Sequence, residues 1–110
     1  MKYLLLIGAG PDSPAEVSPE AIAEATVWVE EMQARGVRLV GDRLRPAEEA
    51  VTVTVRGGKV VTTDGPFAEA KEQMGGFDLL ECRDLEEAIE VASKHPAAKD
   101  GYVELRQLWG

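Results

Sequence analysis

The segment that most constrains the fold is KYLLLIG, residues 2–8. Successive side chains of a strand point to opposite faces, and here both faces are apolar. One face carries Tyr3, Leu5 and Ile7, and the other carries Leu4 and Leu6. This pattern is typical of a central strand covered on both sides, so the fold must supply a layer against each face.

Two segments carry helix start and stop signals. Residues 18–36 (SPEAIAEATVWVEEMQARG) begin with Ser18 as N-cap and Pro19 at the first helical position, and Gly36 ends the predicted helix. Residues 84–96 (DLEEAIEVASKHP) begin with Asp84 as N-cap and close with Lys94 and Pro96. Helical spacing predicts that the buried stripe of the first helix comprises Ile22, Ala25, Val29 and Met32.

Other apolar segments predict strands, at residues 37–44, 76–83 and 101–109. Residues 51–63 (VTVTVRGGKVVTT) predict a hairpin, because Gly57 and Gly58 can adopt the positive φ of a two-residue turn. In that register Val55 pairs with Val60 and Val53 pairs with Thr62. One face of the hairpin is then apolar, and the other is mixed.

The order of these elements predicts one domain, residues 1–110, of the α+β class. Its expected plan is a ferredoxin-like split βαβ fold with an antiparallel sheet and an inserted hairpin. Two helices cover only one face of such a sheet, yet the first strand is apolar on both. A second copy is the simplest cover, so we expect a homodimer whose sheets face each other.

Charge and cysteine content exclude several function classes. The chain has 20 acidic and 12 basic residues, a net charge of −8, which disfavours direct binding to nucleic acid or anionic membranes. Cys82 is the only cysteine, so no disulfide forms within the chain. The apolar run at the N-terminus is too short for a membrane span or a signal peptide. These features together favour a cytoplasmic protein.

The usual catalytic and metal motifs are weak. GAGPDS at residues 8–13 imitates a dinucleotide fingerprint, but its prolines favour a plain loop. His95 precedes Pro96 at a helix end, where an imidazole usually meets free carbonyls or solvent, so catalysis is not favoured. Cys82 alternates with Leu80 and is interpreted as a small buried residue. We expect no metal site and no cofactor, because one His and one Cys do not make a zinc site and the adjacent acidic pairs are typical of solvated faces.

The segment DGPFAEAKEQMGGF, residues 64–77, combines turn chemistry with charge. Asp64, Gly65 and Pro66 suit a turn, and AEAKEQM favours a short helix that Gly75 and Gly76 would end. The turn itself does not require the charged cluster of Asp64, Glu69, Lys71 and Glu72. A structural or interface role for this cluster is favoured over a catalytic one.

Residues 63–96, with YLLLI and GVRLVGDRLRP, resemble the DGPF branch of the YCII-related family. The combined DGPF, K-E and GGF elements carry the likeness, which covers nearly the whole chain. The resemblance implies a ferredoxin-like fold paired as a dimeric α/β barrel. Some relatives use a His and an Asp at the first helix as an acid-base pair, but residues 19–35 contain neither, and rough alignment places Ala25 and Ala34 there. The resemblance therefore implies the fold and dimer more strongly than a reaction, and catalytic residues remain unknown.

Two hypotheses of function follow. The first is a small-molecule binding protein or lyase-type enzyme with a cleft between helix, sheet and partner subunit, in which Asp64 is a candidate base and Arg43 or Lys71 a candidate anion clamp. The second is a regulatory or interaction module whose acidic surface meets a partner linked to an alternative sigma factor, as the resemblance implies. Trp28 could wall the cleft or pack in the dimer. The candidate pocket or interface residues are Asp64, Lys71, Glu72, Arg43 and Trp28.

Overall fold

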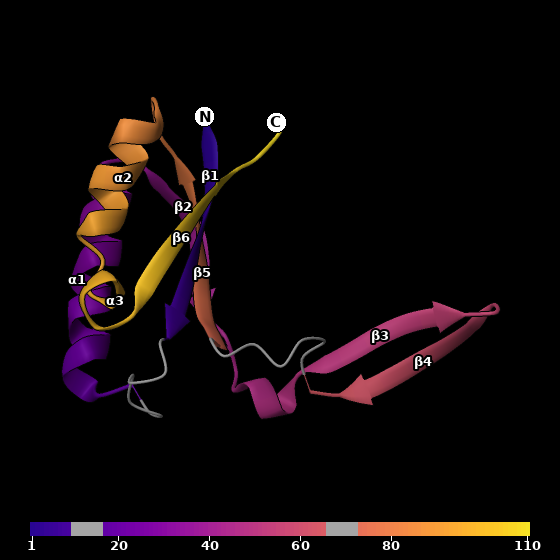
Figure 1. Cartoon of the computed structure of the whole chain (residues 1–110). Helices are drawn as coiled ribbons and strands as arrows, with labels where there is room; N and C mark the ends of the chain where they lie inside the picture. The colour runs from indigo at the N-terminus through magenta and orange to yellow at the C-terminus, as the bar shows by residue number, and fades with distance from the viewer. Residues whose placement is uncertain (10–16, 66–72) are drawn as a thin grey trace.

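A computed structural model describes residues 1–9, 17–65 and 73–110 (Figure 1). The elements are, in order, β1 (Lys2–Ala9), α1 (Pro19–Ala34), β2 (Arg38–Arg43), the 3-10 helix η1 (Ala47–Glu49), β3 (Val51–Arg56), β4 (Lys59–Asp64), β5 (Gln73–Glu81), α2 (Leu85–Ser93), α3 (Ala97–Asp100) and β6 (Tyr102–Gln107).

Four strands form an antiparallel sheet in the order β2-β5-β1-β6. In this order the first and third main strands lie at the centre, which is the ferredoxin-like split βαβ plan predicted from the sequence. Helices α1 and α2 lie on one side of the sheet (Figure 1). The α+β fold is therefore confirmed.

The core lies between those helices and the sheet. Trp28 and Met32 of α1 pack on the face of β1 that carries Tyr3 and Leu5. Cys82 is 3% exposed, as predicted, and burial raises the pKa of its thiol. The buried cluster consists of Tyr3, Leu5, Trp28, Met32, Val37, Leu80, Cys82, Ala88, Val91 and Ala92.

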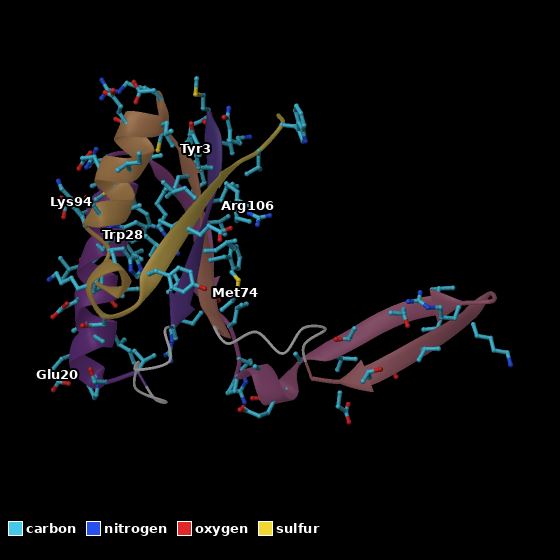
Figure 2. All side chains as sticks on the ribbon, viewed as in Figure 1. Tyr3, Glu20, Trp28, Met74, Lys94 and Arg106 are labelled. Carbon is cyan, nitrogen blue, oxygen red and sulfur yellow. The ribbon has the colours of Figure 1, made fainter. Side chains whose placement is uncertain are left out.

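The other face of the sheet carries a second apolar set. Register places Leu4 beside Leu79 and Leu6 beside Phe77, and all four side chains are half-buried. Figure 2 shows Met74 and Arg106 on this same side, away from the helices. We call this surface the open face, because no described helix or strand covers it.

Strands β3 and β4 form a separate two-stranded hairpin, residues 51–64, which we call the arm. Gly57 and Gly58 have φ values of 58° and 77°, as the turn requires. Val55 pairs with Val60 and Val53 pairs with Thr62, so the predicted register is confirmed. The arm projects away from the sheet and helices (Figure 1), and the radius of gyration is 15.6 Å, where a compact chain of this length has about 13 Å.

One local prediction is wrong. Gly75 and Gly76 do not end a helix but lie inside β5, and neither has a positive φ. A Cβ on Gly76 would lie 2.9 Å from the carbonyl oxygen of Asp42, so glycine here allows β2 and β5 to pair closely. Residues 66–72, which include most of the expected AEAKEQM helix, and residues 10–13 of the GAGPDS loop lie outside the described residues.

Candidate functional site

A cavity of about 420 Å³, which we call the pocket, opens beside the first half of α1. Its other walls come from β1, β2, β5 and the α3 region. Most of the wall supplied by α1 is apolar, whereas β2 and β5 supply charged side chains. The α1 side chains that line it are Ala21, Ile22, Ala25, Thr26 and Val29.

The pocket forms because the apolar stripe of α1 extends beyond the part of the helix that packs in the core. Met32 is fully buried as predicted, but Ile22 is 38% exposed and lines the pocket together with Ala25. The stripe is therefore only partly a packing surface. Trp28, which the predicted stripe did not include, fills the core in its place.

A buried ion pair lies in the pocket wall. Arg38 of β2 donates from Nε to Oδ1 of Asp78 of β5 at 2.7 Å, and the side chains are only 10% and 5% exposed. Burial raises the pKa of Asp78, although the hydrogen bond from Arg38 opposes the shift. A Cβ on Gly41 would lie 2.1 Å from Oδ1 of Asp78, so glycine at this position leaves the pair its room.

His95 is another polar group of the wall. It is 6% exposed, which corrects the expectation that it meets carbonyls or solvent, and burial lowers its pKa to about 4. Its Nδ1 accepts the backbone N–H of Ala97 at 3.0 Å, so the neutral ring carries its proton on Nε2. A neutral histidine of this kind can donate one hydrogen bond from Nε2.

Trp28 packs against the ring of His95. The two rings meet edge to face with centroids 4.7 Å apart, and the indole N–H donates to the carbonyl oxygen of Val91 at 2.9 Å. Trp28 lies in the core, between the helices and the sheet (Figure 2). It therefore supports a pocket residue, and it is not among the residues that line the pocket.

The structure brings together only some of the residues singled out from the sequence. Arg43 lines the pocket, as Arg38 and Asp78 do. Asp64 is exposed at the base of the arm, where it pairs with Val51, and is not a pocket residue. Lys71 and Glu72 lie outside the described residues.

The sequence patterns did not single out Arg38 or Asp78, and they placed His95 at a helix end without indicating a pocket. One signal was available for Asp78: it alternates with Leu80 along β5 and so shares the helix-facing side of that strand. A carboxylate at such a position needs a partner, and Arg38 is the residue opposite Leu80 in the neighbouring strand.

Other kinds of site find little support among the described residues. Within residues 1–9, 17–65 and 73–110, no three His, Cys, Asp or Glu side chains gather as metal ligands would. In the same ranges no helix is both long enough and apolar enough to cross a membrane.

Comparison with known proteins places this chain in a family. The model of the YCII-related domain matches residues 1–110. The chain belongs to the YCII-related family. This YCII-related chain is also similar to uncharacterized protein R00369 of Rhizobium meliloti (strain 1021), with 46% identity over 50 residues. That stretch is 46% of this chain and 40% of the relative, so the two proteins are alike over less than half of either.

The wall of the pocket combines hydrogen-bond donors, hydrogen-bond acceptors and apolar side chains. Arg38 keeps a positive charge next to the Asp78 carboxylate, and neutral His95 is a donor at Nε2. Arg43 adds an exposed positive charge. Such a set can orient a small polar group while the α1 side chains contact an apolar body.

Proposed function

We propose that this YCII-related protein binds a small molecule with an apolar body and one anionic group. The observation that carries the proposal is the buried Arg38–Asp78 pair in the wall of a largely apolar cavity. Ligand pockets typically measure about 300–1,000 Å³ and hold a few polar groups within apolar walls. At about 420 Å³ the pocket fits that range.

The two arginines of the wall can bind the anionic group of a ligand, and they share the pocket with the carboxyl groups of Asp42, Asp78 and Asp100. Arg38 uses Nε for Asp78, and among the described residues its terminal guanidinium nitrogens donate to no other group. Arg43 adds a second guanidinium, and guanidinium groups match the geometry of carboxylates well. The anionic group would lie toward these arginines, with the apolar body against Ala21, Ile22 and Ala25.

If the protein is an enzyme, we propose that it catalyses a lyase-type reaction on the molecule bound in this pocket. Such a reaction needs a group that takes up or releases a proton near the operating pH. Asp78 suits this task better than Asp64, because burial raises its pKa and it lies in the pocket wall.

We also propose that the protein is a homodimer built through the open face. The half-buried side chains of Leu4, Leu6, Phe77 and Leu79 form an apolar set that a second sheet would cover. The alternative function, regulation through a sigma-factor-linked partner, rests on family resemblance and remains a prediction, as does membership of the DGPF branch.

Binding can be tested with 1-anilinonaphthalene-8-sulfonate, a fluorescent probe that has an apolar body and one anionic group. We expect the probe to brighten with the protein and to be displaced by benzoate more readily than by uncharged benzamide. Ala25→Leu fills the pocket and should abolish the signal. The matched control is Ala23→Leu, since Ala23 is exposed on the same helix and is not a pocket residue.

Two outcomes would contradict the proposal. In one, Ala25→Leu and Ala23→Leu bind the probe equally well, which would locate the probe elsewhere, for instance on the open face. In the other, benzamide displaces the probe as well as benzoate does, which would remove any role of the arginines. Circular dichroism of both variants checks that they keep the native fold.

A further inference from the structure

The arm carries a largely apolar face that no described element covers. Pairing places Val51, Val53, Val55 and Val60 on one face of the hairpin, together with Thr62 and, at the base, Asp64, because directly opposed residues share a face. Each of these valines is at least 59% exposed. The other face carries Thr52, Thr54 and Thr63, together with Val61 and, at the tip, Arg56 and Lys59.

The arm also lacks the packing that a stable two-stranded hairpin needs. A two-stranded hairpin is marginally stable in water without a further strand or helix packed on it. Strands β3 and β4 contact chiefly each other, and no described element packs extensively on either. Two hydrogen bonds close the base of the hairpin: the N–H of Gly65 donates to the carbonyl oxygen of Ala50 at 2.7 Å, and the Thr52 hydroxyl donates to the carbonyl oxygen of Gly65 at 2.8 Å.

Charge differs sharply between the arm and the rest of the chain. Arg56 and Lys59 lie at the tip, and with Asp64 they give residues 51–64 a net charge of +1. The rest of the chain, whose total is −8, therefore carries −9. The tip is thus attracted to the body of a molecule like its own.

We propose that the arm lies on a second copy of this chain, with the valine face against the partner's body and the basic tip near its acidic surface. The inference rests on the proposed homodimer and adds a second contact to it. Figure 1 shows the arm projecting on the side of the sheet opposite the helices, which is the side a partner sheet would occupy. Two-fold symmetry then lets each copy give one arm and receive one.

Sedimentation equilibrium of arm variants tests the inference. Val53→Lys with Val55→Lys puts two charges on the valine face, and we expect the dimer dissociation constant to rise by about 100-fold or more, because a desolvated apolar contact is lost. The control is Thr54→Lys with Thr63→Lys, which adds the same charge to the opposite face and should leave dimerisation close to wild type.

A second pair of variants keeps the test independent of folding defects. Arg56→Glu with Lys59→Glu reverses the charge of an exposed tip, and the dimer should weaken at low salt and recover as salt screens the repulsion. Leu79→Lys on the open face probes the sheet contact separately.

The outcomes distinguish failure of the arm inference from failure of the proposed dimer. If Leu79→Lys gives monomers while the valine-face variant dimerises like wild type, the arm inference is overturned and the dimer stands. Equal weakening by the valine-face and threonine-face variants also overturns it. If the wild-type protein is a monomer at every concentration, both proposals fall, while probe binding in the pocket remains a separate question.

Discussion

The two ends of α1 use one amphipathic pattern for different purposes. At the C-terminal end, Trp28 and Met32 are buried against α2 and the sheet; we call this the packed end. At the N-terminal end, Ala21, Ile22 and Ala25 line the pocket; we call this the hollow end. Helix α1 has 16 residues and α2 has 9, so α1 extends about 10 Å further. The difference teaches that a pocket can arise where one of two covering helices stops short.

The hollow end also replaces apolar packing with polar groups. Arg38, Asp78 and His95 lie where a filled core would have aliphatic side chains. Buried polar groups of this kind add stability only when their partners are present. The two ends should therefore respond differently to substitution, and this difference can be measured.

The largest effect is expected from Arg38→Met at the hollow end. The change leaves the Asp78 carboxylate buried without its partner, so the free energy of unfolding at pH 7 should fall by about 3–5 kcal/mol in urea denaturation. Adding Asp78→Leu should restore most of the loss, because the pair is then replaced by apolar groups. A double variant as unstable as the single one would show that the pair is not coupled.

The packed end should show the next largest effect. Met32→Ala opens a cavity in a fully buried site and should lower the free energy of unfolding by about 3 kcal/mol. Ile22→Ala removes a similar side chain from the same helix, but at the hollow end, and should cost less than about 1 kcal/mol. Similar losses for the two variants in urea denaturation would erase the distinction between the ends.

A smaller effect should follow the charge of His95. Burial lowers its folded-state pKa to about 4 from an unfolded value of about 6.5, so the unfolded chain binds the proton first as pH falls. This contribution to stability is present above about pH 6.5 and is lost as pH falls toward about 4. Between pH 7 and 4.5, wild type should lose about 2 kcal/mol more than His95→Gln, since each pKa unit corresponds to about 1.4 kcal/mol. Equal losses would mean that the imidazole titrates normally.

Local sequence signals were enough to predict most of the fold. Ser18 caps α1 by accepting the N–H of Ala21 at 3.1 Å, and the two glycines of the arm set its register, because both features depend on neighbours in the chain. Gly75 and Gly76 were misassigned because glycine is equally suited to a helix end and to a closely paired strand.

The pocket could not be predicted in the same way. Arg38 and Asp78 are 40 residues apart, and they meet through the β2–β5 register, which shifts at a bulge between Arg38 and Val40. His95 lies in the turn between α2 and α3, and it is buried in part because Trp28 of α1 packs on it. Long-range pairing of this kind leaves only a weak trace in a single sequence, such as a carboxylate on a core-facing position.

The smallest effect concerns the two helix caps. Asp84 Oδ1 accepts the N–H of Glu87 at 2.9 Å at the start of α2. The first fully buried residue of α2, Ala88, comes only four residues after Asp84, so Asp84→Ala should cost about 1 kcal/mol of global stability. Ser18 caps the hollow end, where the first turn of α1 can fray without unpacking the core, so Ser18→Ala should cost about half as much.

Hydrogen exchange distinguishes the two responses to cap removal. The amide of Ile22 bonds to the carbonyl oxygen of Ser18 at 3.0 Å, and its exchange should accelerate in Ser18→Ala while amides near Met32 stay protected. The corresponding amide of Ala88, which bonds to the carbonyl oxygen of Asp84 at 3.2 Å, should accelerate in Asp84→Ala only as far as global stability falls. If Ser18→Ala instead accelerated exchange equally along all of α1, the hollow end would be as tightly coupled to the core as the packed end, because fraying would no longer be local.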